Sequence, residues 1–258
     1  MPDETLLISR ICLRAVLPVI KVLVADDPKT SGRFANVNAV VQFRAQHEDG
    51  PIGAHLRFAE GECEVVQELV EKPDLEFRFS SPAKMNAMFA GKPVIPVIRG
   101  WTRFGLLWKV LLLLLKLKLL LPEKKPGNPV DARLKVKMTL YMATTALSQM
   151  NKAGDPEMAK WTGKQPERIY QWSVDGEDIA CYLKVKAGKS KAGRGHYTRR
   201  TAFVHTKFRS INDAIPLLAN EIDTIEAMRQ GLVTVEGSPE YGGQASDFML
   251  RIAKMLCG

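Results

Sequence analysis

The sequence has little of what catalytic and metal-binding proteins are built from. Its 258 residues include only four cysteines and four histidines. The cysteines, Cys12, Cys63, Cys181 and Cys257, lie far apart, which argues against both a zinc site and a disulfide framework. No histidine stands at a recognisable catalytic spacing from a serine, cysteine or aspartate. We therefore expect no metal site, no cofactor and no enzymatic activity.

Motifs for nucleotide and nucleic-acid binding are also missing. The triplet GKS at 188–190 is not a P-loop, because Leu183 stands where that motif needs its first glycine. Residues 184–200 are strongly basic, but Tyr197 is the only aromatic residue among them and no RNA-binding motif occurs. A nucleic-acid partner is therefore disfavoured.

Acidic residues are absent from one long part of the chain, between Asp178 and Asp213. The net charge of the whole chain is +9, which favours an anionic partner. We predict that this basic segment contacts an anionic membrane surface or the phosphates of an acyl-CoA, and the alternative is a solvated hairpin loop. The predicted contact residues are Lys186, Lys189, Lys191, Arg194, Arg199 and Arg200.

Long hydrophobic runs are rare, and the main one is FGLLWKVLLLLLKLKLLL at 104–121. Lys109, Lys116 and Lys118 interrupt it, and each would cost roughly 3 kcal/mol near the centre of a bilayer. We therefore expect a helix that lies against a protein core, a bound lipid or the upper layer of a membrane. The N-terminus, MPDET, is acidic where a secretory signal is basic. These features predict a cytoplasmic protein and leave peripheral attachment to a membrane open.

Hydrophobic periodicity predicts an α+β organisation in the first half. Residues 5–24 form an apolar helix kinked at Pro18. From residue 36 to 79 the period changes to two, with turns between runs, which is typical of an antiparallel meander of about four strands. A capped helix at 83–90, a short strand at 94–100 and the leucine-rich helix at 104–121 complete this half.

The second half repeats this order after a proline-rich linker at 122–129. The short strand before the last helix ends at Gly100 in the first half and at Gly237 in the second. We predict a duplicated α+β protein with domains at 1–121 and 130–258, each an antiparallel sheet covered by helices on one face. The elements expected in the second half are helices at 134–150, 156–162, 211–230 and 245–256, strands at 169–174, 179–185, 199–208 and 231–237, and a basic loop at 186–195.

The segment DLEFRFSSPAKMNAMFAGK at 74–92 resembles the sterol carrier protein type 2 family. In that family a strand leads into a short capped helix closed by glycine and lysine, then into a short strand and a final helix. GLVTVEGSPEYGGQASDFML at 231–250 is similar to the closing strand, glycine and helix of the same family. The resemblance covers 36–121 and, more weakly, 169–256. It implies a tandem pair of sterol-carrier-like domains with an apolar tunnel for a fatty acid, acyl-CoA or sterol.

Side chains that suit such a tunnel are aromatic, methionine or aliphatic, because these adapt to flexible acyl chains. The expected ligand-binding residues are Phe77, Phe79, Met85, Met88, Phe89, Trp101, Phe104, Leu107, Trp108, Leu111, Phe248, Met249 and Ile252. Ordinary core packing is the alternative for all of them. The sequence thus predicts binding and carriage of a hydrophobic ligand such as a lipid. The alternatives are a peripheral membrane scaffold and an accessory protein of acyl-thioester metabolism.

Overall fold

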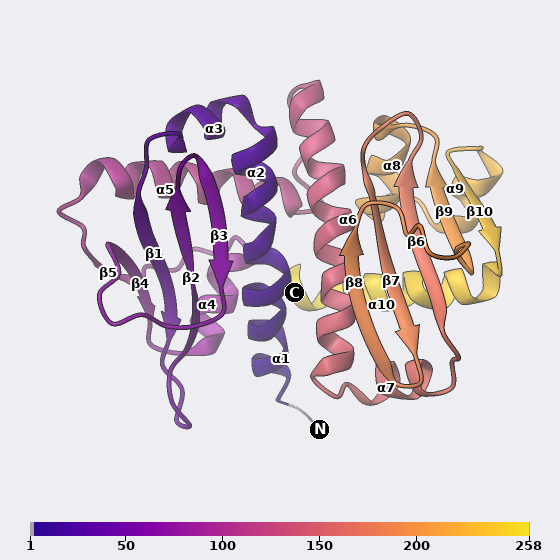
Figure 1. The fold of residues 1–258 in the computed structure, drawn as a ribbon, viewed down its shortest axis with the longest axis horizontal. Coiled ribbons are helices and arrows are strands. Elements are labelled where there is room, and N and C mark those ends of the chain that lie inside the picture. Colours follow the sequence, from indigo (N-terminus) through magenta and orange to yellow (C-terminus); the bar gives the residue numbers. More distant parts are fainter. Residues whose placement is uncertain (1–2, 258) are drawn as a thin grey trace. The chain divides into compact units, whose positions relative to one another are not determined.

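The computed structural model describes residues 3–257, without the side chain of Cys257. Residues 1 and 2, at the start of the first predicted domain, and residue 258, at the end of the second, lie outside the described part. The chain forms two compact units, Asp3–Leu121 and Pro122–Met255. Each unit contains one five-stranded sheet with helices (Figure 1). The predicted α+β class and the duplication are confirmed.

The first unit begins with a long helical segment that is irregular around Pro18. Proline has no N–H to donate, and the α-helical pattern gives way there to a π-helical turn and a 3-10 turn between α1 and α2. The elements are α1 (Glu4–Ile11), α2 (Ile20–Asp26), α3 (Pro28–Phe34), β1 (Ala39–Ala45), β2 (Ile52–Ala59), β3 (Glu62–Val66), β4 (Leu75–Phe79), α4 (Pro82–Phe89), β5 (Val97–Arg99) and α5 (Phe104–Leu117), which a 3-10 turn (Lys118–Leu120) extends.

The second unit repeats this order, with one continuous helix in place of α1 and α2. Its elements are α6 (Pro129–Lys152), α7 (Pro156–Gly163), β6 (Arg168–Val174), β7 (Ala180–Lys186), β8 (Lys189–Arg194), β9 (Val204–Phe208), α8 (Ile211–Leu218), α9 (Thr224–Arg229), β10 (Val233–Gly237) and α10 (Pro239–Cys257). Asn128 caps α6 through its side chain, so that helix starts at the last residue of the predicted linker.

Both sheets have the same strand order, β3-β2-β1-β4-β5 in the first and β8-β7-β6-β9-β10 in the second. Three pairings in each sheet are antiparallel, as expected. The central pairs, β1 with β4 and β6 with β9, are parallel, so the sheets are mixed. The central pairs are parallel because of the connection after the edge strand, which we call the crossing segment: residues 67–74 in the first unit and 195–203 in the second. It crosses the sheet and returns the chain to the end where the first strand began.

A glutamine at the same position of each central strand holds this crossing segment. Gln42 on β1 accepts a hydrogen bond from the backbone N–H of Val70 at 2.7 Å. Gln171 on β6 accepts one from the backbone N–H of Tyr197 at 2.9 Å. The duplication therefore extends from strand order to individual side chains.

The predicted glycines at the ends of the short strands are required by geometry. Gly100 has φ +77° and Gly237 has φ +94°. A Cβ atom at either position would lie 2.1 Å from a backbone carbonyl oxygen, that of Asp74 in the first unit and that of Phe203 in the second. Only glycine avoids both the unfavourable φ and the clash.

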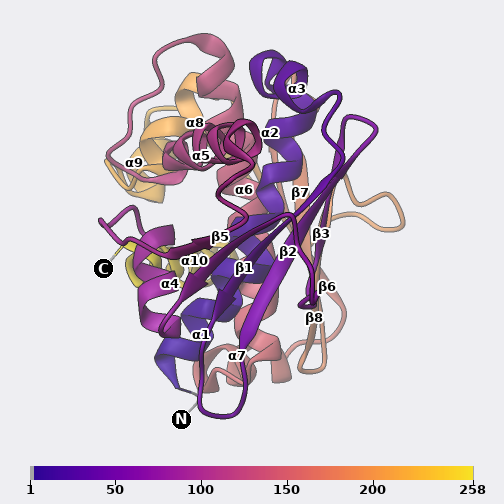
Figure 2. The same cartoon turned by 90° about the vertical axis from the view of Figure 1, so that its left-hand side faces the viewer.

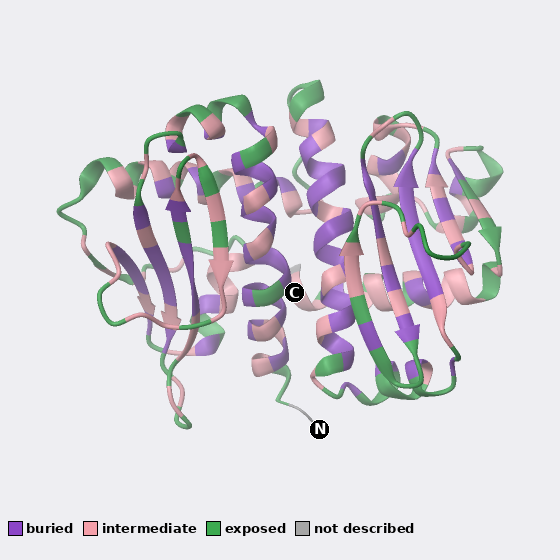
Figure 3. Ribbon diagram, in the orientation of Figure 1, coloured by how far each residue is buried: buried purple, intermediate pink, exposed green. Residues whose placement is uncertain are grey.

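Each core lies between the helices and the inner face of the sheet, where alternate strand residues point. In the first unit Phe43 and Phe58 are fully buried there, and the Phe58 ring stacks on Phe34 of α3 with centroids 4.4 Å apart. Figure 2 shows α4 and α5 on the same side of the first sheet. Figure 3 shows the central strands largely buried, whereas the edge strand β3 is half-buried or exposed.

Three local predictions in the second unit were wrong. The loop expected at 186–195 is only a two-residue turn followed by strand β8, because Ala187 and Gly188 both adopt positive φ, which is typical of a tight hairpin turn. The strand expected at 199–208 begins only at Val204, and the preceding residues belong to the crossing segment. The helix expected at 211–230 is divided into α8 and α9 at Asn220, whose φ is +57°.

Candidate functional site

The expected ligand-binding residues of the first unit fall into two sets, and the first set lies in the core. This set is Phe77, Phe79 and Met85, each at most 2% exposed. The Phe77 ring stacks on Phe43 with centroids 5.1 Å apart. Met88 and Phe89, at the end of α4, are half-buried, and the Phe89 ring lies 5.9 Å from that of Phe43. These contacts are those of a packed core.

The second set lies at the surface and forms what we call the aromatic face of α5. Its members are Trp101, Phe104, Trp108, Leu111 and Leu115, which are 56, 64, 63, 36 and 55% exposed. The four helical positions follow the i, i+4, i+7, i+11 spacing of a single helical stripe. Trp101 precedes the helix, and its ring meets that of Phe104 edge-on at 5.5 Å. Leu107 is half-buried beside this stripe.

The opposite side of α5 anchors the helix to its unit. Val110, Leu113 and Leu117 are buried there, and α5 packs against α2 and α3. Leucines occupy both sides of this helix, and its own unit covers only one of the two sides. Ile95 and Val97, which precede α5 in the chain, are also exposed. Within residues 3–257, no helix has both the length and the apolar character needed to cross a bilayer.

The expected ligand-binding residues of the second unit lie on α10. Ile252 is buried, whereas Phe248 and Met249 are half-buried. The Phe248 ring lies 5.5 Å from that of Trp161 on α7. Arg251 holds α10 to α7 through a 2.7 Å ion pair with the buried Asp155, the residue that caps α7. α10 is therefore fixed to its unit by polar as well as apolar contacts.

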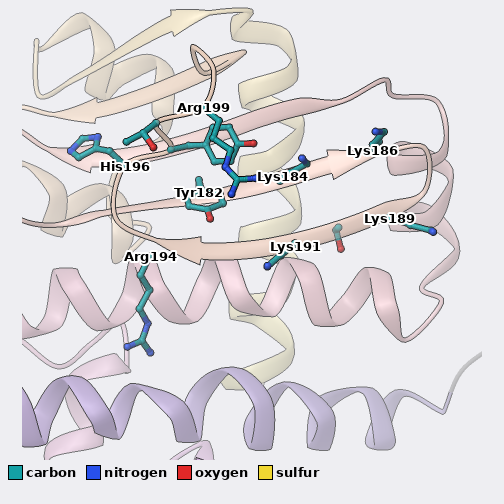
Figure 4. A pocket seen from close by; sticks show the side chains of 11 residues that line it. Tyr182, Lys184, Lys186, Lys189, Lys191, Arg194, His196 and Arg199 are labelled. Carbon is teal, nitrogen blue, oxygen red and sulfur yellow. The ribbon is translucent and has the colours of Figure 1, made fainter.

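The predicted basic residues gather around a pocket of about 450 Å³ on β7, β8 and the crossing segment. Five of the six predicted residues line it, namely Lys186, Lys189, Lys191, Arg194 and Arg199. Lys184, Tyr182, His196 and Tyr197 also line it (Figure 4). Arg200 does not line the pocket. Sequence reasoning did not assign Lys184 to this group, although its alternation with Lys186 along β7 places both on the same face.

A single carboxylate forms ion pairs with three basic residues of this segment. Glu167 lies 3.0 Å from Lys184, 3.3 Å from Lys186 and 3.5 Å from Arg200. The hydrogen bond from Lys184 lowers the pKa of Glu167, and the same bond raises the pKa of Lys184. Within the described part of the chain no carboxylate lies within ion-pair distance of Lys189, Lys191 or Arg199. In Figure 4 Arg194 points toward α6, where its guanidinium lies 4.9 Å from the centre of the Tyr141 ring.

A second polar cluster on the outer face of the same sheet was missed by sequence reasoning. Gln171 lies 2.9 Å from His196, and Ser173 lies 2.8 Å from His205. Burial lowers the pKa of His205, with the charge of Lys207 as the next cause. His196 belongs to the crossing segment, so only the tertiary fold brings it beside Gln171.

Cys12, Cys63 and Cys181 are free thiols, and Cys12 and Cys181 are buried. Burial raises the pKa of Cys12 and of Cys181 to about 12, which leaves both thiols protonated and unreactive at neutral pH. Among residues 3–257, no group of three His, Cys, Asp or Glu side chains is arranged to hold a metal ion.

No family model matches the chain, and comparison with curated protein sequences gives no match. Among solved structures, the chain is similar to a double mutant of the sec-alkyl sulfatase PisA1, with 16% identity and a TM-score of 0.29. It is also similar to the stereoselective inverting sec-alkylsulfatase Pisa1 from Pseudomonas sp., with 15% identity and a TM-score of 0.27. Each match covers 57% of this chain and 28% of the sulfatase. Likeness at this level supports no argument about activity.

Proposed function

We propose that this chain is a cytoplasmic carrier of a hydrophobic ligand of the lipid class, built as a duplicated sterol-carrier-like protein. The observation on which the proposal rests is the aromatic face of α5, an apolar surface that its own unit leaves in water. The resemblance of residues 74–92 to the sterol carrier family supports it. The role we propose is binding, without catalysis.

Covering the aromatic face would release substantial free energy. Trp108 is 63% exposed. Removing that exposed part from water would bury on the order of 150 Å² and contribute roughly 3 kcal/mol. Phe104, Leu111 and Leu115 would add to this on the same side of the helix. An acyl chain contributes ~0.8 kcal/mol for each methylene it buries, so micromolar affinity is within reach after ordering costs.

The position of the ligand follows from the same contacts. Phe77, Phe79 and Met85 are packed in the core, so we place the ligand along α5 rather than between those rings. Trp101, Phe104 and Trp108 then contact it directly, and Leu107 lies at the edge of the contact. Val110 and Leu113 support the helix from behind.

Peripheral attachment to a membrane is the second candidate, and a specific observation favours it. Trp101 and Trp108 are exposed close to Arg99 and Lys109, and tryptophans flanked by cations are typical of surfaces that sit at the lipid headgroup level. In this case the aromatic face would enter the upper layer of a bilayer instead of enclosing one lipid molecule.

Titration with a fluorescent fatty acid, together with native mass spectrometry of the purified protein, tests the proposal. We expect saturable binding that the paired substitutions Phe104→Ser and Trp108→Ser weaken at least tenfold. The control is Ile225→Ser, which removes an apolar side chain that is 80% exposed on α9 in the second unit and should leave binding unchanged. Equal loss in both variants, or no saturable binding by the wild type, would refute the proposal.

Sedimentation with lipid vesicles separates the two candidates. A carrier should retain lipid after gel filtration in the absence of vesicles. A peripheral membrane protein should sediment with vesicles through the same aromatic face and retain no lipid once the vesicles are removed.

A further inference from the structure

Because the two units have the same fold, the strand positions of the basic pocket can be compared with the matching positions in the first unit. On the outer face of the first sheet, the cross-strand neighbours on β2 and β3 are Arg57 with Glu64 and Ala59 with Glu62. The matching positions on β7 and β8 hold Lys184 with Lys191 and Lys186 with Lys189. Glu62 and Glu64 of the first unit are thus replaced by Lys189 and Lys191 in the second. The first unit has one pair of opposite charges there, Arg57 with Glu64, whereas the second places like charges directly opposite each other in both pairs.

Like charges that face each other across neighbouring strands destabilise a sheet. Glu167 forms ion pairs with Lys184 and Lys186, but its single negative charge is shared with a third cation, Arg200. Lys189 and Lys191 are exposed and have no carboxylate within ion-pair distance among the described residues. This arrangement is the one that a bound anion would stabilise, because an anion between the two strands attracts all four lysines at once.

The surroundings make this a recessed site rather than a flat basic patch. Tyr182 lies over Gly193 of β8, where a Cβ atom would come within 2.2 Å of the tyrosine ring. The Tyr182 ring meets the Tyr197 ring of the crossing segment edge-on at 5.0 Å. Both tyrosines and Arg199 line the pocket together with the lysines, and Figure 4 labels Tyr182 and Arg199 there. The pocket of about 450 Å³ has room for a compact organic phosphate.

We propose that this pocket binds the phosphate groups of a multiply charged, soluble phosphorylated ligand. The lysines act as point charges on phosphate oxygens, and the guanidinium of Arg199 is suited to bidentate contact with one phosphate. Tyr182 and Tyr197 offer ring faces and hydroxyl groups to the remainder of the ligand. This inference goes beyond lipid carriage and does not depend on it, because every residue involved lies on the outer face of the second unit, away from its helices.

The test uses the full chain and inorganic pyrophosphate as the probe, with isothermal titration calorimetry and thermal unfolding as readouts. We expect saturable binding by the wild type. The paired substitutions Lys189→Glu and Lys191→Glu, which place glutamates where the first unit has Glu62 and Glu64, should weaken it at least tenfold. The same variant should unfold at an equal or higher temperature than the wild type when no phosphate is present. The matched control is Lys160→Glu with Lys164→Glu, the same charge change at exposed positions on and after α7.

The outcomes separate the possible sources of phosphate. Pyrophosphate binding that only the pocket variant loses supports the proposal. Absence of saturable binding, or equal loss in the pocket variant and the control, overturns it. Binding to phosphatidic acid vesicles that pyrophosphate does not compete with would assign the lysines to lipid headgroups and overturn a soluble ligand. Tighter binding of a single-stranded RNA, weakened equally by both variants, would assign a general nucleic-acid surface and overturn it too.

Discussion

Two leucines on α5 give the sharpest test of how this helix is used. Leu113 is 1% exposed and Leu115 is 55% exposed, although they are two residues apart on the same helix. Leu113 packs toward the unit's interior, whereas Leu115 belongs to the aromatic face. Aspartate at each position introduces the same chemistry, so any difference between the two variants reports on their surroundings alone.

The expected magnitudes differ widely. Leu113→Asp loses a buried leucine, which costs about 2–5 kcal/mol, and it also leaves a carboxyl group without a partner, which adds roughly 1–3 kcal/mol. The sum is a large part of the 5–15 kcal/mol by which a typical domain is stable. Leu115→Asp should cost less than about 1 kcal/mol, because the side chain reaches water. It should instead weaken lipid binding, since it places a charge on the contact surface.

Thermal unfolding by calorimetry and titration with a fluorescent fatty acid should be run on both variants beside the wild type. We expect Leu113→Asp to lower the unfolding temperature strongly and Leu115→Asp to leave it nearly unchanged with weaker binding. Equal loss of stability in the two variants would refute the assignment of the buried and exposed sides. Unchanged lipid binding by Leu115→Asp would show that the aromatic face is not the contact surface.

Three further predictions concern the second unit. Gly237→Ala should destabilise it by about 2–4 kcal/mol in denaturant unfolding, because of the positive φ and the clash with a carbonyl oxygen. The control is Gly105→Ala on α5 of the first unit, where a Cβ meets no atom within 4 Å, and it should gain about 0.5 kcal/mol. Asp155→Ala removes the cap of α7 and the partner of Arg251, and should cost about 2–4 kcal/mol in denaturant unfolding, with Asp155→Asn milder because asparagine still caps. The pKa of His205 is lowered below 6.5 in the folded state, so the unfolded chain binds the proton more readily. Stability should therefore fall as the pH drops through about 6.5, and His205→Gln should reduce that dependence in unfolding curves measured from pH 7.5 to 5.

The duplicated α+β fold could be predicted because its signals are local. Alternation along residues 36–79, the serine before Pro82 and the glycines at 100 and 237 each act over a few residues. The parallel pairing of β1 with β4 could not be predicted, because it depends on where the chain goes after β3. The position of the two-residue turn at Ala187 and Gly188 could not be predicted either, since alanine rarely adopts positive φ.

The candidate sites were predictable as sets of residues but not as surfaces. Leucines surround α5, so periodicity could not tell that Leu113 faces the core while Leu115 faces water. The basic residues were recognisable from the absence of acids between Asp178 and Asp213. Glu167 could not be recognised as their partner, because it lies outside that segment and the fold brings it there.

The contact between ligand and α5 can be measured most directly by quenching of tryptophan fluorescence with a brominated fatty acid. Bromine quenches only nearby indole rings, and the chain has four tryptophans, two of which, Trp101 and Trp108, lie on the aromatic face. We predict that the wild type is quenched saturably and that the double variant Trp101→Phe and Trp108→Phe, which keeps the face apolar, binds the fatty acid with little quenching. Undiminished quenching in the double variant would place the ligand beside Trp161 or Trp172 and contradict the account.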